Sequence, residues 1–216
     1  HIYYKLIYLI YMSGLSASFF VIIIIVSWRY LLYENYTKFL TQYDMLHNTN
    51  PQSSKIPQII NKVYINNSME IDYNTIPKEI QKCHKKWREM NPGYEIRYWS
   101  GNDCRKYLYN HFGKEYLDCF DNINAYSGKC DFFRYCLVYN EGGWYSDWKQ
   151  YPLVSLDEIL KKYTNTHTEW ISFLDKFLIT YLIHVPCMQT AFFGSVPKHP
   201  ILKEAIDICI HNVKNE

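Results

Sequence analysis

Residues 126–153 constrain the fold more than any other stretch, because a helical pattern and a strand pattern meet there at two glycines. Apolar residues recur at helical spacing between positions 126 and 140, namely Phe132, Phe133, Cys136, Leu137 and Tyr139. Gly142 and Gly143 then end the helix, since glycine enters left-handed backbone conformations at little cost. Residues 144–146 follow as a short strand, so the stretch predicts an α/β fold.

Polar residues on both elements converge on one point, and core packing does not explain them. Asp131 and Arg134 lie three apart near the start of the helix and therefore share a face. Asp147 follows the strand, and ligands of open α/β sheets collect at the carboxyl ends of strands. A carboxylate there, beside an Asp/Arg pair, predicts a site for a polar, phosphorylated ligand.

The stretch resembles the DxD-motif glycosyltransferases, which include initiating α-1,6-mannosyltransferases, capsular-sugar transferases and, more distantly, the bacterial glucosylating toxins. The residues that carry the motif, at the family's spacing, are Ser127, Asp131, Arg134, Tyr135, Leu137, Gly142, Gly143, Tyr145, Asp147, Pro152 and Leu153. The resemblance covers about residues 55–212. It implies a GT-A-like fold, with a mixed central sheet flanked by helices, that binds a nucleotide sugar.

The same resemblance implies roles for the residues of the motif. Asp131 would hydrogen-bond the hydroxyl groups of the sugar or ribose, and Arg134 would contact the sugar or the diphosphate. Asp147 would orient ribose and sugar, with Tyr145 beside it in the donor site. Catalysis then depends on stabilising the departing diphosphate while the sugar develops oxocarbenium character.

Residues 55–65 resemble the opening strand of the family, with Asn61 where His is usual and Tyr64 where Trp is usual. The end of that strand normally touches the nucleotide base, so Tyr64 and Ile65 are predicted base contacts. An ordinary core strand is the competing interpretation for either residue.

One departure from the family bears directly on the chemistry, because the second acid of the DxD motif is Lys149 here. In the family the two acids hold a divalent metal on the donor diphosphate, and an ammonium group cannot ligate Mg²⁺ or Mn²⁺. Either Lys149 neutralises the diphosphate itself, or Asp147 holds the metal with help from elsewhere, or the protein is inactive. The predicted catalytic residues are Asp147, Lys149 and Arg134.

Periodicity predicts further elements on both sides of this centre. Helices are expected at 77–90, 102–112, 114–123, 155–163 and 201–213, and strands at 59–65, 94–99, 170–174, 177–185 and 190–196. His199 opens the last helix and is either catalytic or, as is commoner beside a proline, structural. The family usually continues to a His and a Ser-Trp pair near the donor phosphates, so the domain at 55–216 is expected to be truncated at its C-terminal end.

The N-terminal part predicts a membrane anchor. Residues 7–28 carry no charge and match the ~20 residues that cross a bilayer, which places a retained single-pass anchor in residues 1–30 and a polar stem in 31–54. A cleaved signal peptide is the competing interpretation. The flanking charges leave the orientation open, whereas the resemblance implies a type II Golgi or ER protein with a luminal domain. Glycosylation sequons at Asn35 and Asn66 agree with that side.

Composition excludes some functions and leaves others open. A net charge of +2 gives no basic footprint for nucleic acid, and seven cysteines without a CxxC pair predict buried thiols or one or two disulfides rather than a metal cluster. The predicted function is transfer of a sugar from a GDP- or UDP-sugar, with retention, to a glycan, glycoprotein or glycolipid. The alternative is an inactive transferase fold that serves as a membrane-tethered binding module.

Overall fold

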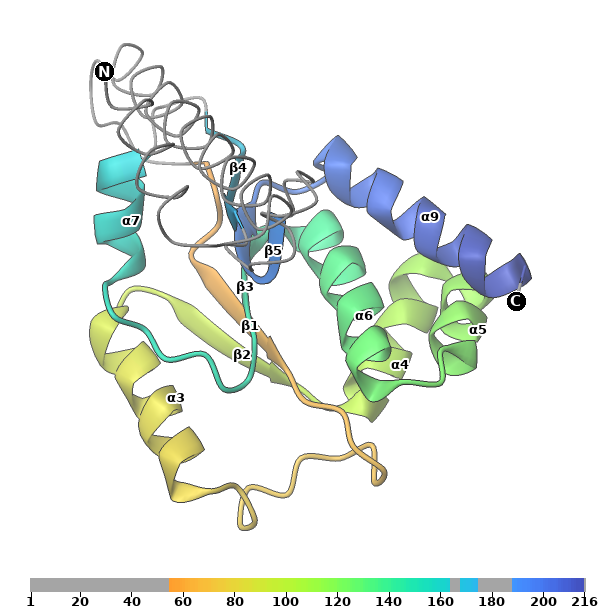
Figure 1. Cartoon of the computed structure of the whole chain (residues 1–216), viewed down its shortest axis with the longest axis horizontal. Helices are drawn as coiled ribbons and strands as arrows, with labels where there is room; N and C mark the ends of the chain where they lie inside the picture. The colour runs from red at the N-terminus through yellow and green to blue at the C-terminus, as the bar shows by residue number, and fades with distance from the viewer. Residues whose placement is uncertain (1–54, 164–167, 175–187, 216) are drawn as a thin grey trace, which may run out of the picture.

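The computed structural model describes residues 55–163, 168–174 and 188–215 (Figure 1). Its centre is a five-stranded sheet in the order β2-β1-β3-β5-β4. The strands are β1 (Ile59–Val63), β2 (Glu95–Trp99), β3 (Gly143–Ser146), β4 (Trp170–Leu174) and β5 (Met188–Ser195). β1 runs parallel to β2 and β3, whereas β5 runs antiparallel to β3 and β4. The predicted mixed central sheet is confirmed.

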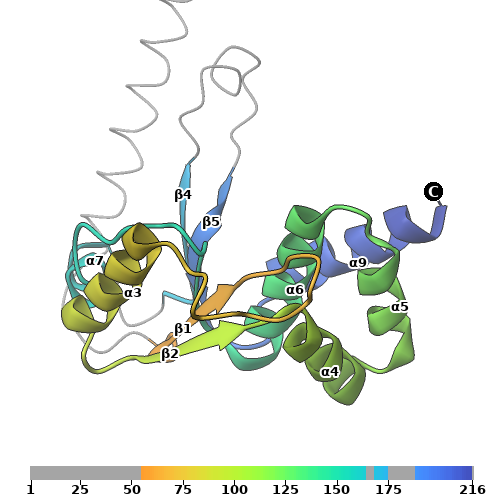
Figure 2. The ribbon, with the colours of Figure 1, turned by 90° about the horizontal axis from the view of Figure 1, so that it is seen from below.

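Helices cover both faces of this sheet, as Figure 2 shows. Helices α3 and α7 lie on one side, and α4, α5, α6 and α9 lie on the other (Figure 2). Their bounds are α3 (Lys78–Met90), α4 (Gly101–Phe112), α5 (Lys114–Asn122), α6 (Tyr126–Glu141), α7 (Leu156–Tyr163) and α9 (Pro200–Asn215). Each helix lies within two residues of its predicted bounds.

Alternation along the strands divides the interior into two cores. Trp144 and Phe192 stack at 5.5 Å and pack against α3 and α7. Their chain neighbours Tyr145 and Phe193 lie 5.8 Å apart on the opposite face, against α6 and α9. Successive strand residues point to opposite faces, so β3 and β5 each supply both cores. Both elements are therefore buried on two sides, and side chains at the end of β3 can be held from either side.

The glycine pair between α6 and β3 is required by geometry. Gly142 has φ 71° and Gly143 has φ 92°, which confirms the predicted glycine stop. A Cβ on Gly143 would lie 2.9 Å from the carbonyl oxygen of Ile59, because β3 passes close to the start of β1 at this point. The turn therefore sets the direction in which the chain passes from α6 into β3.

Replacing Gly143 with alanine should lower the free energy of unfolding by about 1–3 kcal/mol, because the new methyl group meets both an unfavourable φ and the β1 backbone. Urea denaturation measures the loss. Gly93→Ala is the matched control, since a Cβ there meets nothing within 4 Å. A Gly143→Ala protein as stable as the control would contradict the close approach of β3 and β1.

Three predictions concern segments outside the described residues: the strand at 177–185, the membrane span at 7–28 and the stem at 31–54. Within the described ranges, no helix combines the length and the apolar character needed to cross a bilayer. The anchor therefore stays a prediction.

The contacts of His199 and the free thiols of the described cysteines favour structural roles for these residues. The six cysteines in the described ranges are free thiols, namely Cys83, Cys104, Cys119, Cys130, Cys136 and Cys209, while Cys187 lies outside those ranges. Burial raises the pKa of each of the six. His199 lies 5.4 Å from the ring of Trp170, and its Nδ1 accepts a hydrogen bond from the amide of Ile201 at the start of α9. This geometry favours the structural interpretation of His199.

Candidate functional site

The carboxyl ends of β1, β2 and β3 meet at one edge of the sheet, because these strands are parallel. Tyr64 follows β1 directly, and its amide donates to the carbonyl of Trp99 at the end of β2 (3.0 Å). Asp147 follows β3, and its amide donates to the carbonyl of Ala191 on β5 (2.8 Å). The structure thus places Asp147 at the end of β3, where the spacing predicted it.

Arg134 lies buried beneath two half-exposed carboxylates. Its side chain is 6% exposed, whereas those of Asp131 and Asp147 are 47% and 45% exposed. The guanidinium forms an ion pair with Asp131, and its Nη1 lies 3.4 Å from Oδ1 of Asp147. Nη1 also donates to the carbonyl of Thr190 on β5 (2.7 Å), and the group lies over the ring of Tyr145 (4.3 Å). Arg134 therefore holds both carboxylates while its own charge faces the protein interior.

Tyr145 adds a second hold on Asp147. Its hydroxyl donates to Oδ1 of Asp147 at 2.8 Å. Burial raises the pKa of Tyr145 well above its ordinary value, so the hydroxyl stays protonated as a donor. Burial also raises the pKa of Asp131, an effect that the Arg134 guanidinium opposes. The sequence predicted that Asp131, Arg134, Tyr145 and Asp147 share one site, and the structure brings these four side chains together.

Residues 147–150 form a turn, here called the Asp147 turn, in which the amide of Gln150 donates to the carbonyl of Asp147 (3.0 Å). Trp148 is buried and stacks on Tyr64 with ring centroids 5.1 Å apart. Lys149 is exposed. The turn therefore places an aromatic ring in the interior and an exposed positive charge two residues after Asp147.

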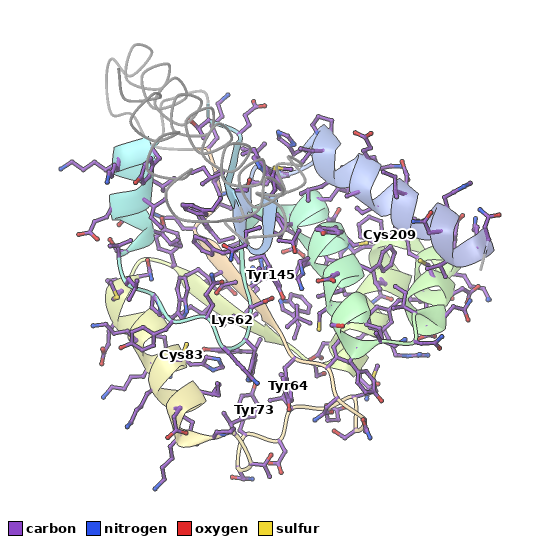
Figure 3. All side chains as sticks on the ribbon, in the orientation of Figure 1. Lys62, Tyr64, Tyr73, Cys83, Tyr145 and Cys209 are labelled. Atoms are coloured by element: carbon purple, nitrogen blue, oxygen red, sulfur yellow. The ribbon has the colours of Figure 1, made fainter. Side chains whose placement is uncertain are left out.

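The two predicted base contacts occupy different environments. Tyr64, which is labelled in Figure 3, is partly buried just after the end of β1. Its ring stacks on that of Trp148. Ile65 is buried and belongs to the core that α4, α5, α6 and α9 cover. An aromatic face suits a planar base, so the geometry favours Tyr64 over Ile65, whose side chain fits the alternative of a core strand residue.

Lys62 contacts the end of β3 beside this site, and the motif did not predict it. Its side chain lies fully buried on β1, and its Nζ donates to Ser146 Oγ (3.0 Å) and to the carbonyl of Asp147 (3.1 Å). The ammonium lies over the ring of Trp87 at 4.7 Å. A sequence signal existed, because a lysine interrupts an apolar run in a strand at the centre of the sheet.

Burial lowers the pKa of Lys62 from 10.5 to about 8, against the opposing attraction of Cys83 and Asp147. A drop of that size disfavours the charged form by about 3 kcal/mol. Because the pKa is lower in the folded chain than in the unfolded one, this cost to stability is present at neutral pH and is relieved as the pH rises from about 8 toward 10.5.

Helix α3 contacts the same turn through polar atoms. His84 Nε2 lies 3.0 Å from the carbonyl of Trp148, while Cys83 Sγ (2.9 Å) and Trp87 Nε1 (2.6 Å) donate to the carbonyl of Gln150. Cys83 and Trp87 are also members of the core between α3 and the sheet. The structure shows that this face of α3 also satisfies backbone carbonyls of the turn.

The side chains described here do not compose a divalent-cation site by themselves. The carboxylates of Asp131 and Asp147 are both paired with Arg134, and an ammonium stands at Lys149 where a second acid ligand would be needed. No group of three or more His, Cys, Asp or Glu side chains suited to a metal ion occurs in the described part of the chain. These side chains alone therefore do not supply the set of oxygen ligands that Mg²⁺ or Mn²⁺ requires.

Comparison with known proteins finds a family match for the part of the chain that contains Arg134 and Asp147. Residues 77–166 match the family described as "Glycosyltransferase sugar-binding region containing DXD motif". The predicted resemblance is confirmed. The matched residues run from the residue before α3 to just beyond α7 and include Arg134, Asp147 and Lys149.

An uncharacterized glycosyltransferase of Acanthamoeba polyphaga mimivirus is 35% identical over 92 residues, which are 43% of this chain and 35% of that protein. The chain thus spans about a third of the length of this curated relative. The solved structure of the PaToxG glycosyltransferase aligns with a TM-score of 0.55 at 14% identity, covering 87% of this chain and 70% of that one. At that identity the likeness shows a shared fold.

Proposed function

We propose that residues 55–216 are the donor-binding domain of a glycosyltransferase that moves a sugar from a UDP- or GDP-sugar to a glycan, glycoprotein or glycolipid. One observation carries the proposal: Arg134 lies buried beneath Asp131 and Asp147 and holds both carboxylates half exposed at the carboxyl end of β3. Two half-exposed carboxylates held side by side in this way can accept hydrogen bonds from the hydroxyl groups of a sugar and a ribose. The match of residues 77–166 to the sugar-binding family supports the same assignment.

The reaction needs a group that stabilises the leaving diphosphate. As the bond from the sugar C1 to the phosphate oxygen breaks, negative charge grows on that oxygen, and a bond from C1 to the acceptor oxygen forms with loss of the acceptor proton. Lys149 is the exposed cation nearest in sequence to Asp147 and would meet that charge directly. The family resemblance supports transfer with retention of configuration at C1.

The same proposal includes the N-terminal residues. Residues 7–28 would anchor the protein as a single-pass membrane protein through the bilayer, with 31–54 as a stem and the domain on the luminal side of the Golgi or ER. The uncharged length of that stretch and the family resemblance support this arrangement.

Donor turnover by the full chain tests the proposal. A panel of UDP- and GDP-sugars is incubated with the protein, and release of nucleoside diphosphate is measured with and without chelator. Asp147→Asn should lower turnover by about 10- to 100-fold, because an amide still hydrogen-bonds but loses its charge contact with Arg134.

Asp157→Asn is the matched control, since Asp157 is an exposed acid on α7 that accepts a hydrogen bond from Tyr94. Both residues lie on the face of the sheet opposite α6 and Arg134. The control variant should leave turnover unchanged. A folded full-length chain that neither binds nor turns over any of these donors would overturn the transferase assignment. Donor binding without turnover would instead support the inactive binding module, which the replacement of the second DxD acid by Lys149 favours.

A further inference from the structure

We propose that Lys62 is a positioning residue that holds the Asp147 turn from the face of the sheet opposite Arg134, so that Asp147 and Lys149 stay directed at the donor. This inference rests on the proposed function. Lys62 is fully buried and cannot touch a ligand itself, so any effect on the donor must pass through the turn.

The turn is held from two faces by separate sets of atoms. On the α6 face, Arg134 and Tyr145 fix the carboxylate of Asp147. On the α3 face, Lys62 fixes the carbonyl of the same residue and the hydroxyl of Ser146. Figure 3 labels Lys62 on β1 and Cys83 on the facing helix α3. The position of Asp147 thus depends on contacts to its side chain from one side and to its backbone from the other.

Where the Asp147 turn faces α3, polar side-chain atoms contact its backbone, although the core on that side of the sheet is otherwise mainly apolar. Carbonyls of Asp147, Trp148 and Gln150 each accept a side-chain partner: Lys62 for the first, His84 for the second, and Cys83 with Trp87 for the third. Buried carbonyls need such partners, because leaving one unsatisfied is costly. These contacts also remove the freedom of the chain that carries Asp147 and Lys149.

Lys62 differs from the other partners because it brings a charge at a cost. The surrounding core consists of residues such as Ile60, Trp87 and Trp144, into which an apolar side chain would pack well. Loss of the lysine would relieve the cost of burying its charge, and it would also leave the Ser146 hydroxyl and the Asp147 carbonyl without that donor. Stability alone is therefore a poor explanation for a lysine at this position. A role in fixing the turn accounts for both of its hydrogen bonds.

The test separates positioning from folding by amide exchange. The amide of Gln150 donates to the carbonyl of Asp147 inside the turn, whereas the amide of Asp147 donates to β5 in the sheet. In the full chain carrying Lys62→Met, we expect the Gln150 amide to exchange about tenfold faster by NMR while the Asp147 amide is unchanged. The melting temperature should change little, because relief of the buried charge offsets the loss of two hydrogen bonds, and donor kcat/KM should fall about tenfold.

Lys129→Met is the matched control, because Lys129 is also buried, donates to two carbonyls (Phe120 and Asp121) and lies over an aromatic ring. It should leave exchange at Gln150 unchanged. Lys62→Gln, which keeps N–H donors without the charge, provides a second variant should Lys62→Met fail to fold, and it should exchange more slowly at Gln150 than the methionine variant.

Two results would overturn the inference: unchanged Gln150 exchange and kcat/KM in a folded Lys62 variant, or faster exchange throughout the sheet with a lower melting temperature. If the wild-type chain turns over no donor, the proposed function fails, yet the exchange experiment still decides whether Lys62 holds the turn.

Discussion

Arg134→Met should reduce donor turnover by about 10²- to 10³-fold, the largest loss expected from any single change outside the Asp147 turn. Arg134 contacts Asp131, Asp147, the carbonyl of Thr190 and the ring of Tyr145 at once. Its removal frees two carboxylates that must be placed together, and displacements of about 1 Å cost roughly 10²-fold in rate. Steady-state kinetics with the best donor of the panel measures the effect.

The same variant should change the titration of the site. Burial already raises the pKa of Asp131, and the Arg134 guanidinium opposes that rise. Without the guanidinium, the pKa of Asp131 should move further up, because Asp147 remains as a like charge beside it. Titration of the carboxyl carbon followed by NMR detects the shift.

Arg97→Met is the control for this change. Arg97 also bridges two carboxylates, those of Glu95 at the start of β2 and Glu141 at the end of α6. Its side chain, however, is 30% exposed. The control variant should cost little stability and leave turnover unchanged. Equal losses of turnover in the two variants would show that Arg134 acts only through general stability.

Much of the fold could be predicted because its signals are local. The apolar spacing of α3 and α6 and the glycine stop at Gly142 each depend on a few neighbouring residues. Asp131, Arg134 and Asp147 could also be grouped, because one helix, one turn and one strand connect them along 17 residues of motif. Even there, the sequence assigned Arg134 to the ligand, and the structure shows it buried under the carboxylates.

The other half of the site depends on contacts between distant segments. Lys62 meets Ser146 across 84 positions, and His84 meets Trp148 across 64. No periodicity of α3 reveals that its buried face will reach the carbonyls of a turn, because that requires the packing of α3 against the end of β3. The buried lysine in β1 was the only local sign that this face of the site is polar.

The replacement of the second DxD acid leads to the other large effect. Lys149→Met should lower turnover by about 10²- to 10³-fold, because the reaction would lose the exposed cation that we propose stabilises the leaving diphosphate. Wild-type turnover should be unchanged by chelator. Lys161→Met is the control, since Lys161 is an equally exposed lysine on α7.

The reverse change, Lys149→Asp, should convert the site to metal dependence. The new carboxylate would stand two residues from Asp147 and supply an oxygen ligand for Mn²⁺, and the change would remove the cation that we propose takes the place of the metal. We expect this variant to be nearly inactive in chelator and to regain activity as Mn²⁺ is added, whereas Lys149→Met should not respond to Mn²⁺. Wild-type turnover that disappears with chelator would contradict this division of labour, because the metal would then be acting despite Lys149. The pair of variants thus distinguishes a lysine that substitutes for the metal from one that merely occupies its ligand position.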